Sequence, residues 1–278
     1  MGIDGMIKYI RYFILATLML WSQALWADTS LPPDIAAIQQ RGTLRLAVYQ
    51  IPIPPMTIKD SKGHWSGIEI DIAQMIANQL SVKLVVIPTS TYDNIVNLVA
   101  NNKADLGAEV YVTPERALKI NFSHPYYSFH PHLLVNRLQA TKYNWNTQAQ
   151  VIQNLQQKTP VTIGVVLGGA TVQVIQENFP NMKIVGYNTD TQAFQDVVDG
   201  KIFAAVGATS MSVQQFLSQN PRDALVAEDI ILPQATILVS IAISWENFHL
   251  RELIDSYFEY LQKNGVLTSV FQKYGVTP

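Results

Sequence analysis

Cysteine is absent from this chain of 278 residues, so no disulfide can brace its fold. Charge is also scarce: 14% of the residues are charged, and the net charge is −2. Because a surface that binds nucleic acid needs a basic field, this composition argues against a nucleic-acid partner. Apolar residues make up 48% of the chain, enough to bury a large core in one or two globular domains.

Long apolar runs are rare as well. The N-terminal block from Tyr12 to Trp21 has ten residues, whereas a helix that crosses a bilayer needs about 20. Lys8 and Arg11 precede this block and Ala27 ends the segment after it, an order typical of a secretory signal. We predict that residues 1–27 are a cleaved signal peptide and that the mature protein is periplasmic. The alternative is an uncleaved anchor.

The usual motifs of nucleotide and acyl chemistry are missing too. The sequence contains no nucleophile elbow, phosphate loop or dinucleotide fingerprint. This argues against an enzyme, and no cofactor is expected.

The apolar pattern alternates between strand and helix periods in both halves of the chain. Leu44, Leu46 and Val48 recur at every second position, whereas Ile68, Ile72 and Ile76 recur at helical spacing. Expected strands lie at 43–48, 83–87, 105–110, 161–166, 183–187 and 202–206, with helices between them. The order predicts an α/β protein with two lobes, each built on a mostly parallel sheet. Ligands of such sheets bind beyond the carboxyl ends of the strands, in the cleft between the lobes.

Two further regions complete the predicted organisation. The polar segment 139–158 is expected to be a surface excursion of the second lobe, and helices near 253–261 and 267–274 close the chain.

The segment 103–127 carries the strongest functional signal. Thr113 is placed to cap a helix that opens at Pro114, with Arg116 in its first turn. A guanidinium beside a positive helix end suits a carboxylate, which Arg binds with two parallel hydrogen bonds. The alternative is that Arg116 pairs with Glu115 or solvent on a helix surface.

Five segments resemble the family-3 extracellular solute-binding proteins, the polar amino acid receptors of bacterial ABC importers. They are 41–48, 63–73, 103–127, 163–169 and 261–275. The resemblance implies a type II periplasmic-binding-protein fold and a monomer that delivers an amino acid or small carboxylate to an inner-membrane ABC permease. It also implies two crossings between lobes, which assigns 28–129 plus 229–278 to the first lobe and 130–228 to the second. A receptor without cysteine lacks the lipid anchor that many such proteins use.

The resemblance implies that Arg116 binds the ligand's carboxylate. Tyr111 stands where the family has a small hydroxyl residue, and Glu109 where it has Gly or Ser. If Glu109 faces the cleft, it is expected to bind an ammonium or another cationic group; if it turns outward, it is a solvated carboxylate at the end of a strand.

The remaining ligand-binding positions depart further from the family. Tyr92 matches an aromatic residue that stacks on the ligand, and Met56 replaces one. In the second lobe Gly169, Ala170 and Thr171 occupy a turn that usually carries Ser or Thr. The family's ammonium-binding Asp falls at Ala208, so either Glu109 replaces it or the ligand lacks an α-amino group.

Three other functions compete with the receptor. Some proteins of this fold are periplasmic dehydratases of cyclohexadienyl acids, and Glu109 with His124 or His130 could supply acid and base. His124, His130 and His132 could bind a metal, although we expect them to be solvated hinge residues. A sensor or lytic-enzyme module would need a second membrane helix or an appended domain, neither of which is expected here.

Overall fold

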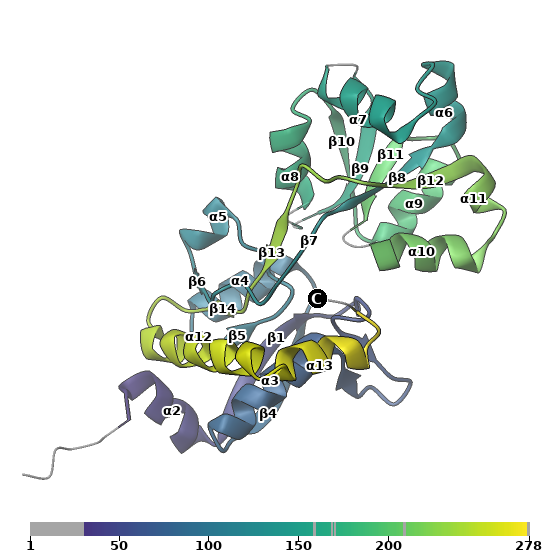
Figure 1. Cartoon of the computed structure of the whole chain (residues 1–278). Coiled ribbons are helices and arrows are strands. Elements are labelled where there is room, and N and C mark those ends of the chain that lie inside the picture. Colours follow the sequence, from purple (N-terminus) through teal and green to yellow (C-terminus); the bar gives the residue numbers. More distant parts are fainter. Residues whose placement is uncertain (1–30, 158–159, 168, 170, 208–209, 277–278) are drawn as a thin grey trace, which may run out of the picture.

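The structure, a computed structural model, describes residues 31–157, 160–167, 169, 171–207 and 210–276. The chain forms two α/β lobes joined by two extended segments (Figure 1). The predicted signal peptide, Ala170 and Ala208 lie outside the described residues. No helix of the described part is both long and apolar enough to cross a membrane.

The first lobe is built on a five-stranded sheet with the order β4-β1-β5-β14-β6. Its first three strands are parallel, and β14 runs antiparallel to both of its neighbours. Leu44, Leu46 and Val48 are completely buried, as their alternation predicts. The strands are β1 (Thr43–Tyr49), β4 (Lys83–Thr89), β5 (Leu106–Gly107), β6 (Asn121–Phe122) and β14 (Ala242–Ile243), with a small hairpin of β2 (Ile58–Lys59) and β3 (Trp65–Ser66).

Helices from both ends of the chain cover this sheet. The C-terminal helices contribute Phe258 and Phe271 to the same core as Ile68 and Ile72, so these helices return to the lobe that β1 and α3 form (Figure 1). The helices are α2 (Pro33–Arg41), α3 (Ile68–Gln79), α4 (Tyr92–Ala100), α5 (Pro114–Ala117), α12 (Phe248–Lys263) and α13 (Val266–Lys273).

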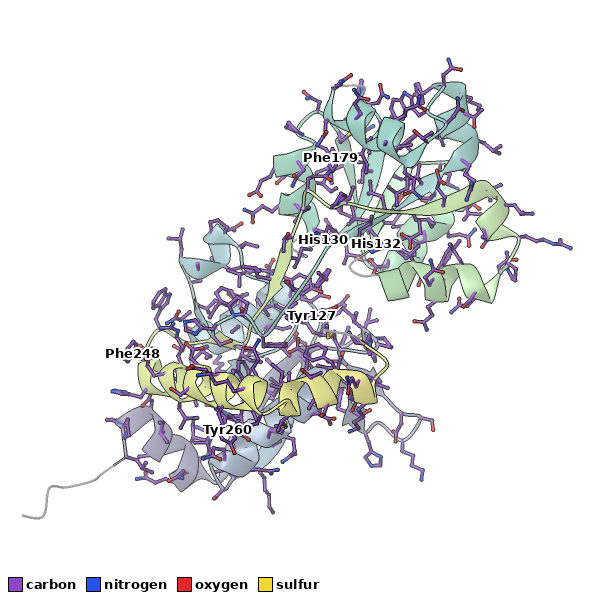
Figure 2. The ribbon with its side chains drawn as sticks, viewed as in Figure 1. Tyr127, His130, His132, Phe179, Phe248 and Tyr260 are labelled. Atoms are coloured by element: carbon purple, nitrogen blue, oxygen red, sulfur yellow. The ribbon has the colours of Figure 1, made fainter. Side chains whose placement is uncertain are left out.

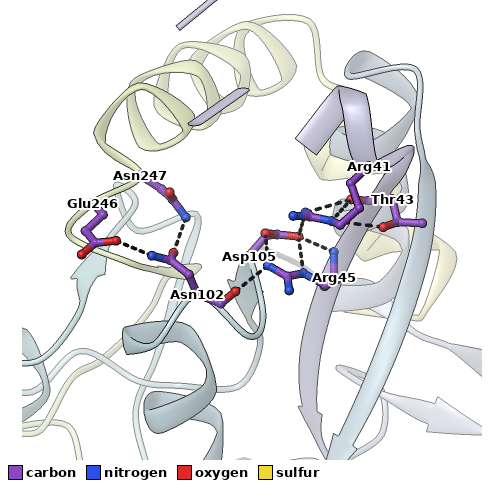
Figure 3. Close-up of polar contacts among 7 residues, drawn as sticks. All are labelled: Arg41, Thr43, Arg45, Asn102, Asp105, Glu246 and Asn247. Atoms are coloured by element: carbon purple, nitrogen blue, oxygen red, sulfur yellow. Dashed lines mark hydrogen bonds and ion pairs between the residues drawn. The ribbon is translucent and has the colours of Figure 1, made fainter. Parts of the chain in front are cut away.

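Charged side chains hold the amino end of β5, at the end of the sheet that faces away from the cleft. Asp105 accepts hydrogen bonds from Arg41 and from both the backbone and the guanidinium of Arg45, as Figure 3 shows. Asn102 joins this network to the loop before α12 through Glu246 and Asn247. These contacts set where β5 starts, and therefore where its carboxyl end opens into the cleft.

The second lobe repeats the plan with the sheet order β10-β9-β11-β8-β12. The polar segment predicted as a surface excursion instead forms two helices, because Trp145, Val151 and Leu155 supply enough apolar surface to pack into the core. The strands are β8 (His132–Asn136), β9 (Thr162–Val166), β10 (Lys183–Tyr187), β11 (Ala204–Gly207) and β12 (Ala227–Ile231). The helices are α6 (Arg137–Lys142), α7 (Gln148–Gln156), α8 (Thr171–Asn178), α9 (Asp190–Val198), α10 (Ser210–Gln219) and α11 (Asp223–Val226).

Two paired strands connect the lobes, β7 (Tyr127–Phe129) and β13 (Ile237–Val239). Figure 2 places Tyr127, His130 and His132 in succession along the first connection. The predicted return at residue 229 is wrong, because β12 pairs with β8 inside the second sheet. The chain re-enters the first lobe only through β13.

Candidate functional site

A cavity of about 310 Å³ lies between the lobes, at the carboxyl ends of β1, β5, β9 and β10. This volume is at the lower end of the range for small-molecule sites, about 300 to 1,000 Å³. The first lobe contributes Tyr49, Ile53, Tyr92, Glu109, Tyr111 and Arg116 to its lining, and the second contributes Val166, Gly169, Thr171, Asp190, Phe194 and Phe216.

Arg116 lies at the edge of this cavity with only 8% of its surface exposed. Its Nη1 donates to the backbone oxygen of Tyr111 at 2.9 Å, and its backbone N–H donates to the capping hydroxyl of Thr113. Burial lowers the pKa of Arg116, while Asp93 acts in the opposite direction. Because α5 is a single turn of four residues, the predicted helix dipole contributes little. Any attraction for an anion here therefore comes mainly from the guanidinium itself.

Tyr111 is placed in the cavity wall, but its ring packs toward the hinge. It makes an edge contact with Phe129, with centroids 5.4 Å apart, and lies in one apolar cluster with Ile237 and Val239. Burial raises its pKa well above the usual value. The phenol is therefore neutral and connects the ligand site to both hinge strands.

Glu109 faces the cavity, but not through the strand geometry that the sequence predicts. The ladder of β5 ends at Gly107, and Glu109 takes a left-handed conformation with a φ of 61°. Its Oε1 accepts a 2.5 Å hydrogen bond from the hydroxyl of Thr57, and its Oε2 accepts one from the backbone N–H of Tyr49. Burial raises the pKa of this carboxyl to about 8 despite these two donors.

A second buried carboxyl lies close enough to interact with Glu109. Glu69, at the start of α3, is completely buried and accepts a hydrogen bond from the hydroxyl of Tyr126. Burial raises its pKa to about 7, and its charge contributes to the raised pKa of Glu109. Two carboxyls in this environment favour neutral forms when the cleft is empty.

Two tyrosines form an aromatic wall at the end of β1 and the start of α4. The rings of Tyr49 and Tyr92 are stacked with centroids 4.8 Å apart. The hydroxyl of Tyr49 also donates to the backbone oxygen of Asn188 at 3.3 Å. Since Asn188 belongs to the second lobe, this bond crosses the cleft.

The second lobe adds Gly169, Thr171 and an acidic residue that the sequence analysis missed. Asp190 begins α9 and lines the cavity. Burial by the surrounding protein raises the pKa of the Asp190 carboxyl to about 7.

Met56 does not line the cavity. It is 6% exposed and packs in the first-lobe core with residues such as Ile68. Ile53 and Pro54 face the cavity instead. The prediction that Met56 contacts the ligand therefore has no support from its position.

The three histidines proposed as a metal site have separate partners. His124 lies near Asp255, His130 contacts the backbone oxygen of Ala235, and His132 pairs with Asp229 at 2.7 Å. Among the described residues no group of three His, Cys, Asp or Glu side chains could hold a metal ion. The expectation of solvated side chains is wrong for His132, whose side chain is only 15% exposed and contacts Asp229.

Tyr49 and Asp190 could have been found from topology alone. Tyr49 ends β1, and Asp190 begins the helix that follows β10 after the two residues Asn188 and Thr189, and ligands bind at the carboxyl ends of such parallel strands. No comparable signal in the sequence indicates that Glu69 lies behind Glu109.

The chain belongs to the bacterial extracellular solute-binding proteins, family 3, whose pattern matches residues 46–277. Cyclohexadienyl dehydratase of Pseudomonas aeruginosa is 28% identical over 198 residues, which cover 70% of this chain and 69% of that protein. Membrane-bound lytic murein transglycosylase F of Salmonella arizonae is 26% identical over 273 residues, 96% of this chain. The chain spans about half of that relative, 51% of its length.

The fold is that of solved amino acid receptors. An ancestral amino acid-binding protein, described as a precursor of cyclohexadienyl dehydratase, superimposes with a TM-score of 0.70 and 25% identity, over 86% of this chain and 98% of the other. The predicted type II periplasmic-binding fold is thereby confirmed.

Proposed function

We propose that the protein is a periplasmic receptor that binds an amino acid or a related small carboxylate in the interlobe cleft and delivers it to an ABC permease. The observation that carries this proposal is the buried guanidinium of Arg116 at the edge of a cavity lined by both lobes. An ancestral amino acid-binding protein of the same fold supports it. The receptor acts as a monomer, because each chain supplies both walls of its own cleft.

A thermal-shift screen of the purified protein against amino acids, polyamines and small carboxylates identifies the ligand. A ligand at 100 times its dissociation constant adds about 2.7 kcal/mol to the free energy of unfolding. Arg116→Ala should then weaken binding by about 2 to 5 kcal/mol, and Arg116→Lys should restore little, because an ammonium cannot reproduce the guanidinium fork.

Arg137→Ala is the matched control, since this second-lobe Arg is half exposed and does not line the cavity. It should bind as the wild type does. If Arg116→Ala leaves the affinity unchanged in calorimetry, the carboxylate assignment fails.

The location is tested on the exported protein. We propose that residues 1–27 are removed and that the mature protein begins near Asp28. Mass spectrometry of a periplasmic extract should give this terminus; a protein that starts at residue 1 or stays with the membranes contradicts it.

A dehydratase is the second candidate, and Glu109 favours it. A carboxyl with a pKa of about 8 is largely protonated at neutral pH and could protonate a leaving hydroxyl group as a general acid. The 28% sequence identity to cyclohexadienyl dehydratase supports a test for this activity. The test is incubation of the purified protein with cyclohexadienyl acids, followed by product analysis. Turnover that is lost in Glu109→Gln would establish a dehydratase, whereas the absence of turnover by the wild type would exclude this activity.

A further inference from the structure

Asp190 is a cleft carboxylate that a simple carboxylate receptor does not need. It occupies the first turn of α9, but Thr189 caps this helix by accepting from the backbone N–H of Gln192. Within the described residues, no hydrogen bond or ion pair to the Asp190 carboxyl is found. The residue lines the cavity, so a ligand bound there would lie close to it.

The simplest explanation is that the Asp190 carboxylate interacts favourably with the dipole of α9, as acidic residues in the first turn of a helix often do. A helix N-terminus lowers the pKa of a nearby carboxyl. The pKa of Asp190 is instead raised to about 7, because burial dominates. The dipole therefore does not account for an acid placed where ionisation is unfavourable in the empty site.

A second acid faces the same space from the other lobe. Glu109 and Asp190 both raise the pKa of Tyr49 and Tyr92 through their charge, so the two carboxyls approach this tyrosine pair from opposite lobes. Among the described lining residues Arg116 is the single Lys or Arg. With all three groups ionised, the site carries two negative charges and one positive charge.

This charge balance selects among ligands. A zwitterionic amino acid adds one carboxylate for Arg116 and one ammonium, which leaves one of the two acids without a cationic partner, so that this acid stays protonated. A buried unpaired charge is strongly unfavourable. A ligand with a second cationic group satisfies both acids, and the faces of Tyr49 and Tyr92 suit a cation as well.

We propose that Glu109 binds the α-ammonium of the ligand while Asp190 binds a second, distal cationic group, so that the receptor selects basic amino acids over neutral ones. The inference rests on the proposed receptor function. Glu109 belongs to the first-lobe segment that also carries Arg116, and a ligand's α-ammonium lies beside its carboxylate. Asp190, on the opposite lobe, is left for the far end of the ligand.

The test compares L-arginine with L-citrulline, which has the same shape but an uncharged side chain. Calorimetry on the wild type should show at least tenfold tighter binding of arginine. Asp190→Asn should weaken arginine binding 10- to 100-fold and change citrulline binding less than threefold. Glu109→Gln should weaken both. Asp199→Asn, at the far end of the same helix and exposed, should change neither.

Agmatine, which is arginine without the carboxylate, separates this inference from the receptor proposal. Arg116→Ala should weaken arginine and citrulline but not agmatine. Equal losses for arginine and citrulline in Asp190→Asn, no loss in either, or a wild type that prefers citrulline overturn the role of Asp190. Tight binding of a different carboxylate instead of these compounds also overturns it, while leaving the receptor function in place. If no compound of the full screen binds, the receptor proposal itself fails.

Discussion

Glu109 combines two unfavourable features in one residue. Its φ of 61° places a non-glycine residue in the left-handed region, at a cost of roughly 1 to 2 kcal/mol. The residue is only 3% exposed, so burial opposes ionisation of its carboxyl. Strain of this kind persists only where the surrounding structure imposes it, and it gathers at ligand sites. The resembling family places Gly or Ser here, residues that carry no carboxyl to bury.

Glu109 should make the empty protein less stable as the pH rises. An acid whose pKa is raised by folding, here from 4.5 to about 8, binds more protons in the native state than in the unfolded state between these values. The free energy of unfolding therefore falls from pH 4.5 to 8, on the order of a few kcal/mol. Glu109→Gln removes the titrating group, so urea unfolding should show a smaller decline.

The exposed Glu252 is the control for this measurement, because it lies far from the cleft on α12. Glu252→Gln should follow the wild-type pH dependence. Some decline should survive in Glu109→Gln, because Glu69 and Asp190 also have raised pKa values. If the Glu109→Gln and wild-type curves are parallel, Glu109 does not titrate as described.

At the scale of elements, the single turn of α5 positions the proposed anchor. The Thr113 hydroxyl accepts from the backbone N–H of Arg116, so the cap and the ligand anchor are one unit. Thr113→Ala should cost about 0.5 to 2 kcal/mol of stability and also weaken ligand binding several-fold, because Arg116 loses its backbone restraint. Thr113→Ser should preserve both properties.

The second lobe offers a matched cap far from the ligand. Thr147 caps α7 in the same way, by accepting from the backbone N–H of Gln150. Thr147→Ala should therefore lose similar stability in chemical unfolding and keep the wild-type affinity in calorimetry. Equal affinities for the two alanine variants would show that the Thr113 cap stabilises α5 without orienting Arg116.

The elements were predictable where apolar spacing is unambiguous. The C-terminal helices and the strands expected at 43–48, 83–87, 161–166 and 183–187 lie where they were expected, since Leu44 and Phe258 belong to long periodic runs. The strand expected at 105–110 is shorter, and β6, β8, β12 and β14 were not predicted. The position of the second crossing, where the chain returns from the second lobe to the first, was not predictable in this way. Both 227–231 and 237–239 are short β-prone runs, and only pairing with β8 or β7 shows which one lies in the second sheet.

The site residues likewise divide into features that the sequence predicts and features that it does not. Tyr92, Glu109, Tyr111 and Arg116 line the cavity, as expected from the segments that carry them. The orientation of Glu109 depends on a left-handed backbone that no periodic pattern indicates. Burial of the carboxyls is a property of the packed lobes, so their raised pKa values could not be derived from the sequence.

At the scale of the whole molecule, the two proposed cation-binding acids belong to different lobes. Glu109 lies on the first lobe and Asp190 on the second, and Tyr49 already bonds across the cleft to Asn188. A ligand held by both acids joins the lobes and therefore favours the closed arrangement. The hinge strands β7 and β13, against which Tyr111 packs, are the elements that must bend.

Binding of a cationic ligand to this molecule should release protons. Near pH 7 the carboxyls of Glu109 and Asp190, with pKa values of about 8 and about 7, are partly protonated when the cleft is empty. A bound cation favours their ionised forms, so affinity should rise with pH between about 6 and 8. Other titratable groups that act on this part of the protein are Glu69, the neighbouring tyrosines, and Arg116 with the carboxylates of Asp93 and Glu115.

Calorimetry of L-arginine binding in two buffers of different ionisation enthalpy measures this release directly. The apparent binding enthalpies in phosphate and in Tris should differ by the number of protons released times the difference in buffer ionisation enthalpy. Asp190→Asn and Glu109→Gln should each reduce that difference. A neutral ligand bound through a protonated Glu109 gives the opposite sign, because its affinity falls as the pH rises. Equal enthalpies in the two buffers, with an affinity independent of pH, would show that neither carboxyl changes its protonation state when the cleft is filled.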